Sequence, residues 1–542
     1  MLSGGPALHP RHATVPAALE AAAKSRWGLG FLDARERETR LAFAALHERA
    51  MQTAGGLREL GVRRGDRVAI VLPTGPEFMD AFFGALYAGA VPVPLYPPVR
   101  LGRLDEYHLR TARMLETCSA RIVLSDSRIS RLLGVAVSRA RPPLGLHQVP
   151  EGPELIEAAA ALALIQFSSG TTVDPKPVAL THANVLANLA AIETIVPPGD
   201  EQSGVSWLPL YHDMGLIGCL LLAVYRPGPL TLFGPELFLA RPALWLRAIS
   251  RNRATLSVAP NFAYGLCARR IRDQEMAGVD LSSWRFALNG AEPVAPAVLR
   301  RFAERFARWG FDAPALMPVY GLSEASLAVT FTPPGRGSRS EQVEQRELPS
   351  VGAPLPGVDV DVREGRIFVR GPSVMQAYFG NPSATAEALR DGWLDTGDLG
   401  FVSGGELFVS GRAKEVIVLR GANHSPQQFE DALDGLPGVR AGCAAAVGAP
   451  GREGEELVLL VETAGTTDPE AISARINERT GIRPDSVRLL APGTLPRTSS
   501  GKLRRSEALR QLQAGELRPP RPVTLLHLAK EMARSALAKA RT

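Results

Sequence analysis

Hydroxyl groups, amide groups and one lysine are concentrated in residues 165–177, Ile-Gln-Phe-Ser-Ser-Gly-Thr-Thr-Val-Asp-Pro-Lys-Pro. The apolar run at residues 162–167 predicts a short buried strand, and apolar residues at helical spacing follow from 181 to 195. Amide groups in a turn form a concavity for anions, and a lysine adds a point charge. We therefore predict a strand, a polyphosphate-binding loop and a helix. The candidate loop residues are Ser168, Ser169, Gly170, Thr171, Thr172 and Lys176.

This loop does not fit a Walker NTPase. That motif needs a glycine directly before its lysine and a hydroxyl residue directly after it, whereas Pro175 and Pro177 occupy these places here. A polar surface turn that carries an ordinary exposed lysine is an alternative that the stretch alone leaves open.

A second cluster with suitable chemistry is Tyr320-Gly321-Leu322-Ser323-Glu324. A tyrosine ring can stack on a base, and a hydroxyl group can reach a phosphate. Mg²⁺ prefers a carboxylate or two together with phosphate oxygens, so Glu324 is a candidate metal ligand. The alternative is an ordinary Tyr-Gly turn before a helix.

Three charged residues farther along the chain could complete a nucleotide site. Asp398 lies in a glycine-flanked turn; it could accept hydrogen bonds from both ribose hydroxyls, or it could only satisfy its own turn. Arg412 could hold ribose or phosphate, or could be a linker charge. Lys502 ends a loop of threonine, serines and glycine, and taken alone it would be read as part of a basic surface loop.

Composition narrows the classes of protein. A chain of 542 residues is too long for one core, so we expect at least two domains. The net charge of +6 is small for this length and no long Lys/Arg block accompanies it, which argues against nucleic-acid binding; it could favour an acidic protein partner.

Four scattered cysteines indicate a reducing compartment. The longest apolar run, residues 215–225, is too short for a transmembrane segment, and no signal peptide is evident, so we expect a cytoplasmic protein.

Helices that alternate with short apolar strands predict an α/β fold with largely parallel sheets covered on both faces. We expect helices at 41–57 and 76–88, and strands at 67–72, 91–95, 121–125, 162–167, 255–258 and 286–288. Residues 333–350 combine proline, glycine and charge without an apolar period, which predicts a surface loop. Strands at 366–370 and 406–410 follow.

A second, smaller α+β segment begins near Arg412. It has predicted strands at 416–419, 444–447 and 457–461, and predicted helices at 426–434 and 469–479. The expected division is a loose N-terminus (1–15), a large N-terminal domain (16–411), a hinge (412–414), a small C-terminal domain (415–512) and a basic amphipathic tail (513–542). A basic amphipathic helix can lie on a membrane or a partner; we favour a helix that docks on its own domain.

Taken in order, these clusters resemble the adenylate-forming superfamily, which contains acyl-CoA synthetases, peptide-synthetase adenylation domains and luciferases. The resemblance covers residues 35–510, and its motifs are the phosphate loop, Tyr320–Glu324, Asp398, Gly411-Arg412-Ala413-Lys414 and the Lys502 loop. It implies a large N-terminal domain and a small mobile C-terminal domain. The chain departs from the usual phosphate loop at Val173 and Pro177, where glycines are expected.

Within the superfamily, the chain is most similar to fatty acyl-AMP ligases. The stretches that carry this similarity are Pro94-Leu95-Tyr96-Pro97-Pro98, residues 206–216, Asn289-Gly290-Ala291-Glu292-Pro293 and residues 421–426. Those ligases carry an insertion after the Tyr-Gly-Leu motif that is thought to restrain the small domain. Here residues 332–351 are too few for a full insertion, and this leaves the acyl acceptor open.

The resemblance implies how a carboxylate and MgATP would give acyl-AMP and pyrophosphate. The 168–176 loop would hold the β- and γ-phosphates, and Lys176 would act there. Gly290, Ala291, Glu292 and Tyr320 would bind adenine, with Gly321, Leu322 and Ser323 beside the nucleotide. Asp398 and Arg412 would bind ribose or phosphate, Glu324 would hold Mg²⁺, and Lys502 would lie between the substrate carboxylate and the α-phosphate. His212 would stand at the entrance of the acyl pocket, and Lys414 would be the hinge.

Three functions remain open at this point. The first is a fatty acyl-AMP ligase that loads the phosphopantetheine thiol of an acyl carrier protein. The second is an acyl-CoA ligase that uses free CoA, which the short insertion favours. The third is a nucleotide-binding pseudoenzyme, suggested by Val173 and Pro177. The apolar stretches 216–225 and 262–266 could line a tunnel for a fatty tail, or could be plain core.

Overall fold

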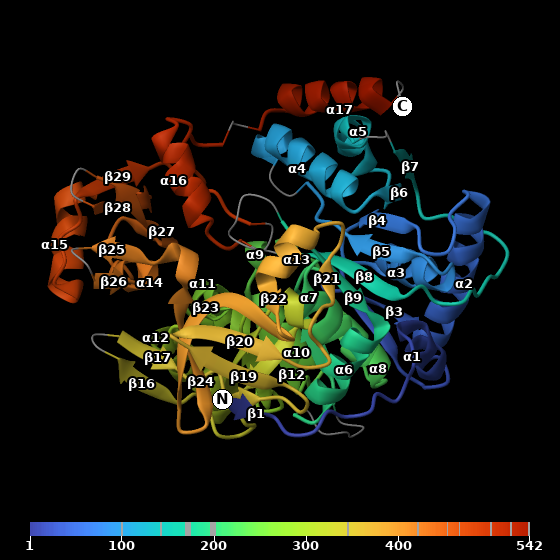
Figure 1. Ribbon diagram of the computed structural model, residues 1–542, viewed down its shortest axis with the longest axis horizontal. Coiled ribbons are helices and arrows are strands. Elements are labelled where there is room, and N and C mark those ends of the chain that lie inside the picture. The colour runs from blue at the N-terminus through green and yellow to red at the C-terminus, as the bar shows by residue number, and fades with distance from the viewer. Residues whose placement is uncertain are drawn as a thin grey trace.

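The computed structural model describes residues 1–98, 101–140, 144–168, 175–195, 202–343, 346–419, 422–451, 454–465, 467–498, 501–520 and 523–539. It contains a large domain and a smaller domain that lies beside it (Figure 1). Parallel sheets with helices on their faces dominate the large domain, and this confirms the predicted fold class.

One sheet of the large domain is parallel and buried on both faces. Its strands, in spatial order, are β5 (Val91–Pro94), β4 (Arg67–Val71), β6 (Ala120–Ser125) and β7 (Gly145–His147). Helices α2 (Phe43–Glu59) and α3 (Pro76–Tyr87) cover one face, and α4 (Leu104–Thr117) and α5 (Ser130–Arg139) cover the other. In β4, Val68 and Ile70 enter one hydrophobic cluster while Ala69 and Val71 enter the other. A strand buried on both faces has a continuous apolar run, which is why its position was predictable.

The second sheet has six parallel strands at its centre and antiparallel strands at both edges. In order it contains β18 (Ala353–Pro354), β15 (Ala328–Phe331), β14 (Leu316–Gly321), β13 (Phe286–Asn289), β12 (Leu256–Ala259), β10 (Gly204–Ser206), β11 (Leu230–Leu232), β2 (Gly28–Leu32) and β3 (Glu38–Ala42). Helices α6 (His182–Glu193), α8 (Leu222–Tyr225), α10 (Ala243–Arg251), α11 (Asn261–Arg270) and α12 (Pro296–Phe306) pack with it in one large core. The carboxyl ends of β12, β13 and β14 therefore share one edge.

The candidate phosphate loop joins two antiparallel strands. It connects β8 (Leu162–Phe167) to β9 (Pro177–Thr181), and β9 also pairs with β21 (Ala377–Tyr378). The predicted order of strand, loop and helix is therefore corrected to strand, loop, strand and helix α6. Pro177 is the first residue of β9, a position where a missing N–H is tolerated.

A six-stranded antiparallel sheet includes the start of the chain. Its order is β1 (Leu2–Ser3), β19 (Asp359–Arg363), β20 (Arg366–Arg370), β23 (Trp393–Ser403) and β22 (Leu389–Arg390), and β24 (Glu406–Arg412) pairs with β23. Residues 1–15 had no predicted element. Leu2 nevertheless pairs with Val360, and Thr14 caps helix α1 (Val15–Ala22). This pairing was not predictable because two residues carry no periodicity.

Residues 333–350, expected to be a surface loop, contain the hairpin β16 (Ser340–Val343) and β17 (Arg346–Pro349). Polar contacts hold it: Glu347 accepts hydrogen bonds from Arg300 at 2.7 and 2.9 Å and from the Ser340 hydroxyl at 2.5 Å. The two strands, Ser-Glu-Gln-Val and Arg-Glu-Leu-Pro, show no regular alternation of apolar and polar residues, so the pattern could not indicate them.

The small domain has its own hydrophobic clusters, whose first residue is Ile417. Its elements are β25 (Ile417–Leu419), β26 (Ala422–His424), α14 (Pro426–Ala432), β27 (Val439–Pro450), β28 (Glu455–Thr463), α15 (Pro469–Thr480), β29 (Ser486–Leu490) and α16 (Arg505–Gln513). Strands β27, β28 and β29 form one sheet, and β25 pairs with β26.

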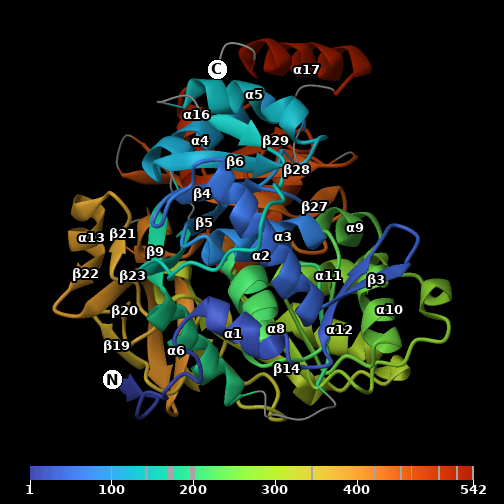
Figure 2. The ribbon, with the colours of Figure 1, turned by 90° about the vertical axis from the view of Figure 1, so that its right-hand side faces the viewer.

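Helix α17 (Leu525–Lys539) lies over α4 and α5 of the large domain, as two perpendicular views show (Figures 1 and 2). The backbone N–H of Gly134 on α5 donates to the Ser535 hydroxyl at 2.7 Å, and Arg534 forms an ion pair with Asp105 of α4 at 2.9 Å. The helix therefore docks within its own chain, on the large domain and not on the small domain that precedes it. Over the described residues, the helices are all too short or too polar to cross a membrane.

Candidate active site

The site lies at the carboxyl ends of the parallel strands, where ligands bind in open α/β sheets. Gly290, Ala291 and Glu292 follow β13, and Tyr320 and Gly321 end the neighbouring strand β14. Gly290 is required by the close approach of these strands, because a Cβ there would lie 2.8 Å from Val319 Cγ2 and 3.0 Å from its carbonyl oxygen. Ala291 has a φ of 70°, which turns the chain sharply at the edge of the site.

Tyr320, Asp398 and Arg412 form a hydrogen-bonded group. The Tyr320 hydroxyl donates to Asp398 Oδ2 at 2.7 Å, and Arg412 Nε lies 3.0 Å from Oδ1 of the same carboxylate. Asp398 and Arg412 face each other across β23 and β24. The Asp398 charge raises the pKa of Arg412, and burial followed by that charge raises the pKa of Tyr320. A carboxylate can accept about four hydrogen bonds, so Asp398 can accept more than these two.

Tyr378 connects the candidate metal ligand to the phosphate-loop lysine. Its hydroxyl donates to Glu324 Oε1 at 2.8 Å, and Lys176 Nζ lies 4.7 Å from the centre of its ring. Burial raises the pKa of Glu324. Tyr378 was not predicted as a site residue. The only available signal was an aromatic residue before a Gly-Asn-Pro turn.

The described ends of the phosphate loop close on each other. The Ser168 N–H donates to the Lys176 carbonyl at 2.9 Å, and the Lys176 N–H lies 3.2 Å from the Ser168 hydroxyl. Ser169, Gly170, Thr171 and Thr172 lie outside the described residues.

Asp213 is a second group that the sequence interpretation missed, although it stands within the quoted stretch 206–216. It begins the short helix α7 (Asp213–Gly215), and its Oδ2 accepts a hydrogen bond from the Ser323 hydroxyl at 2.5 Å. Its neighbour His212 has a pKa lowered to about 3 by burial, and by the positive charge of Lys502 as a smaller cause. His212 is therefore a neutral imidazole at physiological pH.

Lys502 enters this cluster from the small domain. Its loop is closed by the Thr498 N–H, which donates to the Lys502 carbonyl at 2.8 Å, and by the Lys502 N–H, which donates to the Thr498 hydroxyl at 3.0 Å. Burial and then the charge of Arg412 lower the pKa of Lys502, while the carboxylates of Asp213, Glu292 and Asp398 act in the opposite direction. The structure thus brings Lys502 next to both groups of the large domain.

The N-terminal end of α4 holds the small domain in this position. Arg504 is 2% exposed and lies 3.6 Å from Glu106, while Arg103 donates to the Thr494 carbonyl at 2.9 Å. The Tyr107 hydroxyl donates to the carbonyl of Tyr96 at 3.2 Å. The Tyr-Pro-Pro stretch is therefore joined through Tyr96 to α4, the helix that contacts the small domain.

The candidate hinge lies between β24 and β25. Lys414 is exposed in the short helix η7 (Ala413–Glu415), and its neighbour Glu415 is buried against Arg505 at 2.6 Å. Arg505 also pairs with Glu430 at 2.7 Å. A buried ion pair directly after Lys414 therefore holds the small-domain side of this connection.

An apolar cavity of about 140 Å³ opens beside Asp213, Ala291 and Tyr320. Gly218 and Leu222 line one wall, from the π-helical turn η2 (Leu216–Leu221) and helix α8, and Val258 of β12 lines another. Leu216 and Ile217 point into the core instead. Stretch 216–225 therefore lines the cavity on one face, whereas 262–266 does not line it.

The fold and the site define a class of enzymes. A large α/β domain carries a cluster of polar side chains at the ends of its strands, and a small domain places a lysine beside that cluster. The family of AMP-binding enzymes matches residues 19–379, more than half of the chain. The chain belongs to this family.

Three similar proteins narrow the comparison. A putative acyl-CoA synthetase of Caulobacter vibrioides is 36% identical, over 93% of this chain and 96% of that protein. The medium-chain-fatty-acid–[acyl-carrier-protein] ligase JamA of Moorena producens is 33% identical, over 89% of this chain and 91% of that protein. A solved structure from a study of fatty acyl-adenylate ligases of E. coli and L. pneumophila superposes with a TM-score of 0.88 at 34% identity, over 94% of this chain and 99% of that one.

Proposed function

We propose that the protein activates a fatty or related carboxylic acid with ATP and passes the acyl group to the thiol of an acyl carrier protein. The observation that carries this proposal is the position of Lys502, a cation of the small domain set among Asp213, Glu292, Asp398 and Arg412. Asp213 also lines the apolar cavity. A cation is needed at that point because a carboxylate and a triphosphate repel each other.

In the first step, a carboxylate oxygen of the acid attacks the α-phosphorus of ATP, and the bond from that phosphorus to the pyrophosphate oxygen breaks. Lys502 stabilises the charge that builds up on the transferring group. The loop from Ser168 to Lys176 holds the pyrophosphate. Tyr320 with Gly290–Glu292 binds adenine, and Asp398 with Arg412 binds ribose. Neutral His212 bounds the acyl entrance without adding charge.

Mg²⁺ fits the donor set around Glu324. One carboxylate oxygen accepts from Tyr378 and the other remains for a cation, and hard cations take carboxylate and phosphate oxygens. Bound there, Mg²⁺ would neutralise phosphate charge beside Lys176. Gly321, Leu322 and Ser323 place the glutamate, and the Ser323 bond to Asp213 fixes that turn.

In the second step, a thiol attacks the acyl carbon and AMP leaves. We infer that Lys414 is the hinge about which the small domain turns to admit that thiol. Free CoA is the alternative acceptor, which the printed name of the Caulobacter relative supports, whereas that of JamA supports a carrier protein. The four cysteines are unpaired, which supports a reducing compartment such as the cytoplasm.

Product analysis tests this proposal. The protein is incubated with ATP, Mg²⁺ and a panel of fatty acids, with either CoA or a holo carrier protein present at equal concentration. We expect acyl-AMP in the absence of acceptor and faster acylation of the carrier. Steady acyl-CoA formation at the adenylation rate, without carrier labelling, would make the protein an acyl-CoA ligase. Pyrophosphate release without any acyl-AMP would favour the pseudoenzyme alternative.

A further inference from the structure

The contact between α4 and α17 brings together three side chains that can hold a metal ion. Asp105 and His108 lie one turn apart on α4, and Glu531 comes from α17. A ring nitrogen of His108 and one carboxylate oxygen of each acid lie within 4.8 Å of one another. None of the three belongs to the nucleotide site.

His108 is completely buried, and its contacts leave one ring nitrogen for a ligand. Nε2 lies 2.8 Å from the carbonyl oxygen of Leu132. A carbonyl only accepts hydrogen bonds, so Nε2 carries the proton and Nδ1 of the neutral ring has a lone pair. Nδ1 has no hydrogen-bond partner among the residues that the structure describes. A histidine that donates its other N–H to a backbone carbonyl is held in the orientation that metal ligands use.

Glu531 is the second of these side chains with a buried polar atom. The residue is 6% exposed in a helix that covers the large domain, and within the described part of the chain its Oε2 has no hydrogen-bond partner. A buried carboxylate oxygen without a partner is costly. Arg534 compensates part of the charge, because its Nη1 lies 2.9 Å from Asp105 Oδ1 and 3.7 Å from Glu531 Oε1. The lone pairs of His108 Nδ1 and Glu531 Oε2 still have no hydrogen-bond donor.

We propose that Asp105, His108 and Glu531 bind a divalent transition-metal ion of the zinc type, which fastens α17 to the large domain. One imidazole nitrogen and two carboxylate oxygens suit Zn²⁺, whereas Mg²⁺ and Ca²⁺ take oxygen ligands. Tetrahedral zinc ligands lie about 3.4 Å apart, so the three side chains close around the ion by small rotations. Asp105 is exposed and leaves a solvent side for a water as the fourth ligand.

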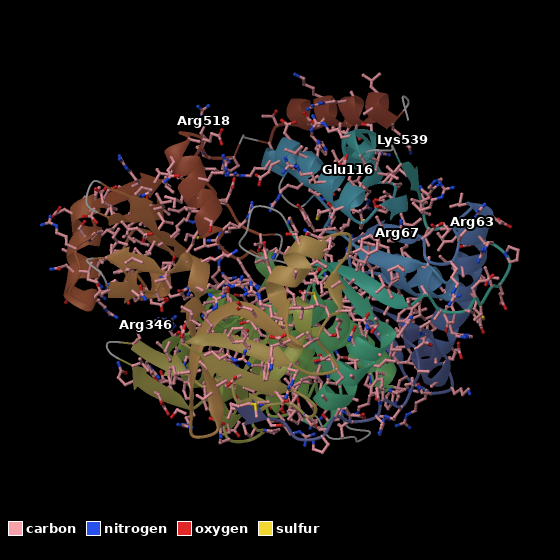
Figure 3. All side chains as sticks on the ribbon, in the orientation of Figure 1. Arg63, Arg67, Glu116, Arg346, Arg518 and Lys539 are labelled. Atoms are coloured by element: carbon pink, nitrogen blue, oxygen red, sulfur yellow. The ribbon has the colours of Figure 1, made fainter. Side chains whose placement is uncertain are left out.

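The position of this site gives it a consequence for the small domain. The other side of α4 contacts that domain through Glu106 and Arg103. Figure 3 labels Arg518 on the stretch between α16 and α17, and Lys539 near the end of α17. A metal ion at α17 therefore fastens the chain that follows α16 to the large domain. The candidate hinge joins the other end of the small domain to the large domain.

Metal binding to the full-length protein tests the proposal. The protein is treated with a chelator and titrated with Co²⁺ and then Zn²⁺, in the absence of ATP. We expect one equivalent of Co²⁺ with the visible absorption of a tetrahedral site, displaced by Zn²⁺. Glu531→Gln and His108→Asn lose this equivalent. The control Arg534→Gln, on the same helix, breaks the ion pair with Asp105 but retains the metal.

Hydrogen exchange of α17 provides the second measurement. Zn²⁺ should slow exchange of the α17 amides in the wild type and in Arg534→Gln, but not in Glu531→Gln. A wild type that binds no equivalent would overturn the proposal, and would mean that a proton shared by His108 and Glu531 takes the place of the ion. Equal metal content in Glu531→Gln and the wild type would also overturn it. If His108→Asn does not fold, the wild-type spectrum and Glu531→Gln decide.

Discussion

Lys502 stands between charges of both signs, and its protonation sets the pH range of the first step that we propose. Burial and the charge of Arg412 lower its pKa, so it loses its proton at a lower pH than an ordinary lysine. Only the charged form can stabilise the transferring phosphoryl group. His212 has a pKa of about 3 and contributes no change in charge above pH 5.

The rate of acyl-AMP formation should therefore fall on the alkaline side, earlier than the ordinary lysine pKa would predict. In Lys502→Arg the guanidinium stays charged, so the alkaline fall should move to higher pH even if the maximum rate is lower. Pyrophosphate release from pH 6 to 10 measures this. The same alkaline fall in both proteins would show that another group titrates.

A second prediction at the residue scale concerns Glu324. Glu324→Gln should raise the Mg²⁺ concentration for half-maximal adenylation by about tenfold, because a neutral amide is a poorer ligand for a hard cation. Tyr378→Phe is the matched control, since it removes the hydrogen bond to Oε1 but keeps the carboxylate. A magnesium titration of Glu324→Gln identical to the wild type would place the carboxylate away from the metal.

At the scale of elements, the π-helical turn η2 lines the apolar cavity, in which we propose that the acyl chain binds. A Cβ at Gly218 would lie 2.7 Å from Leu327 Cδ2, the far end of a flexible side chain, so a larger residue can fit there while it fills the cavity. Gly218→Phe should shift the substrate preference to shorter acids, with a loss of about tenfold in kcat/KM for each methylene that no longer fits. Activity on a chain-length series measures this, and an unchanged preference would place the acyl tail elsewhere.

The sequence predicted the elements that bury a continuous apolar run and missed those held by contacts far along the chain. Leu162–Phe167 and Arg366–Arg370 were predicted with the bounds that the structure has, because their apolar residues mark the strands. Strand β9, the β16–β17 hairpin and the docking of α17 depend on partners such as Phe167, Arg300 and Gly134. A single sequence holds no record of such pairings.

The same limit applies to the site. Motif order indicated which residues meet, and the structure does bring Tyr320, Asp398, Arg412 and Lys502 together. Tyr378 and Asp213 were missed because each is tied to the site by a hydrogen bond to another side chain. Tyr378 donates to Glu324, and Asp213 accepts from Ser323. Ser169 to Thr172 remain a prediction from the motif alone.

At the scale of the whole molecule, the β16–β17 hairpin contacts the strand that leads to the hinge. Arg346 Nη1 donates to the Ser410 carbonyl at 3.2 Å, and Figure 3 labels Arg346 on the hairpin, at its side toward the small domain. Although short, this hairpin is placed where it can restrain rotation of the small domain. We therefore expect it to affect the choice between a carrier protein and free CoA.

Arg346→Ala should raise transfer to free CoA relative to carrier protein by several-fold, with adenylation unchanged, because the hinge strand loses a hydrogen bond to the hairpin. Arg370→Ala is the control. It breaks an ion pair with Asp359 in the six-stranded sheet that also contains Ser410, and it leaves the hairpin unchanged. Competition between CoA and a holo carrier, quantified by mass spectrometry, measures the ratio. An unchanged ratio would remove the hairpin from acceptor choice.

The most direct test of the account is single-turnover formation of acyl-AMP by the wild type and by Lys502→Ala. Each protein is mixed with ATP, Mg²⁺ and a fatty acid, and acyl-AMP is measured by mass spectrometry alongside equilibrium binding of ATP. We predict that the variant binds ATP nearly as well as the wild type but forms acyl-AMP at least about a hundredfold more slowly, because one preorganised charge is lost at the reacting centre. Equal rates in the two proteins, or no acyl-AMP from the wild type with any acid, would contradict it.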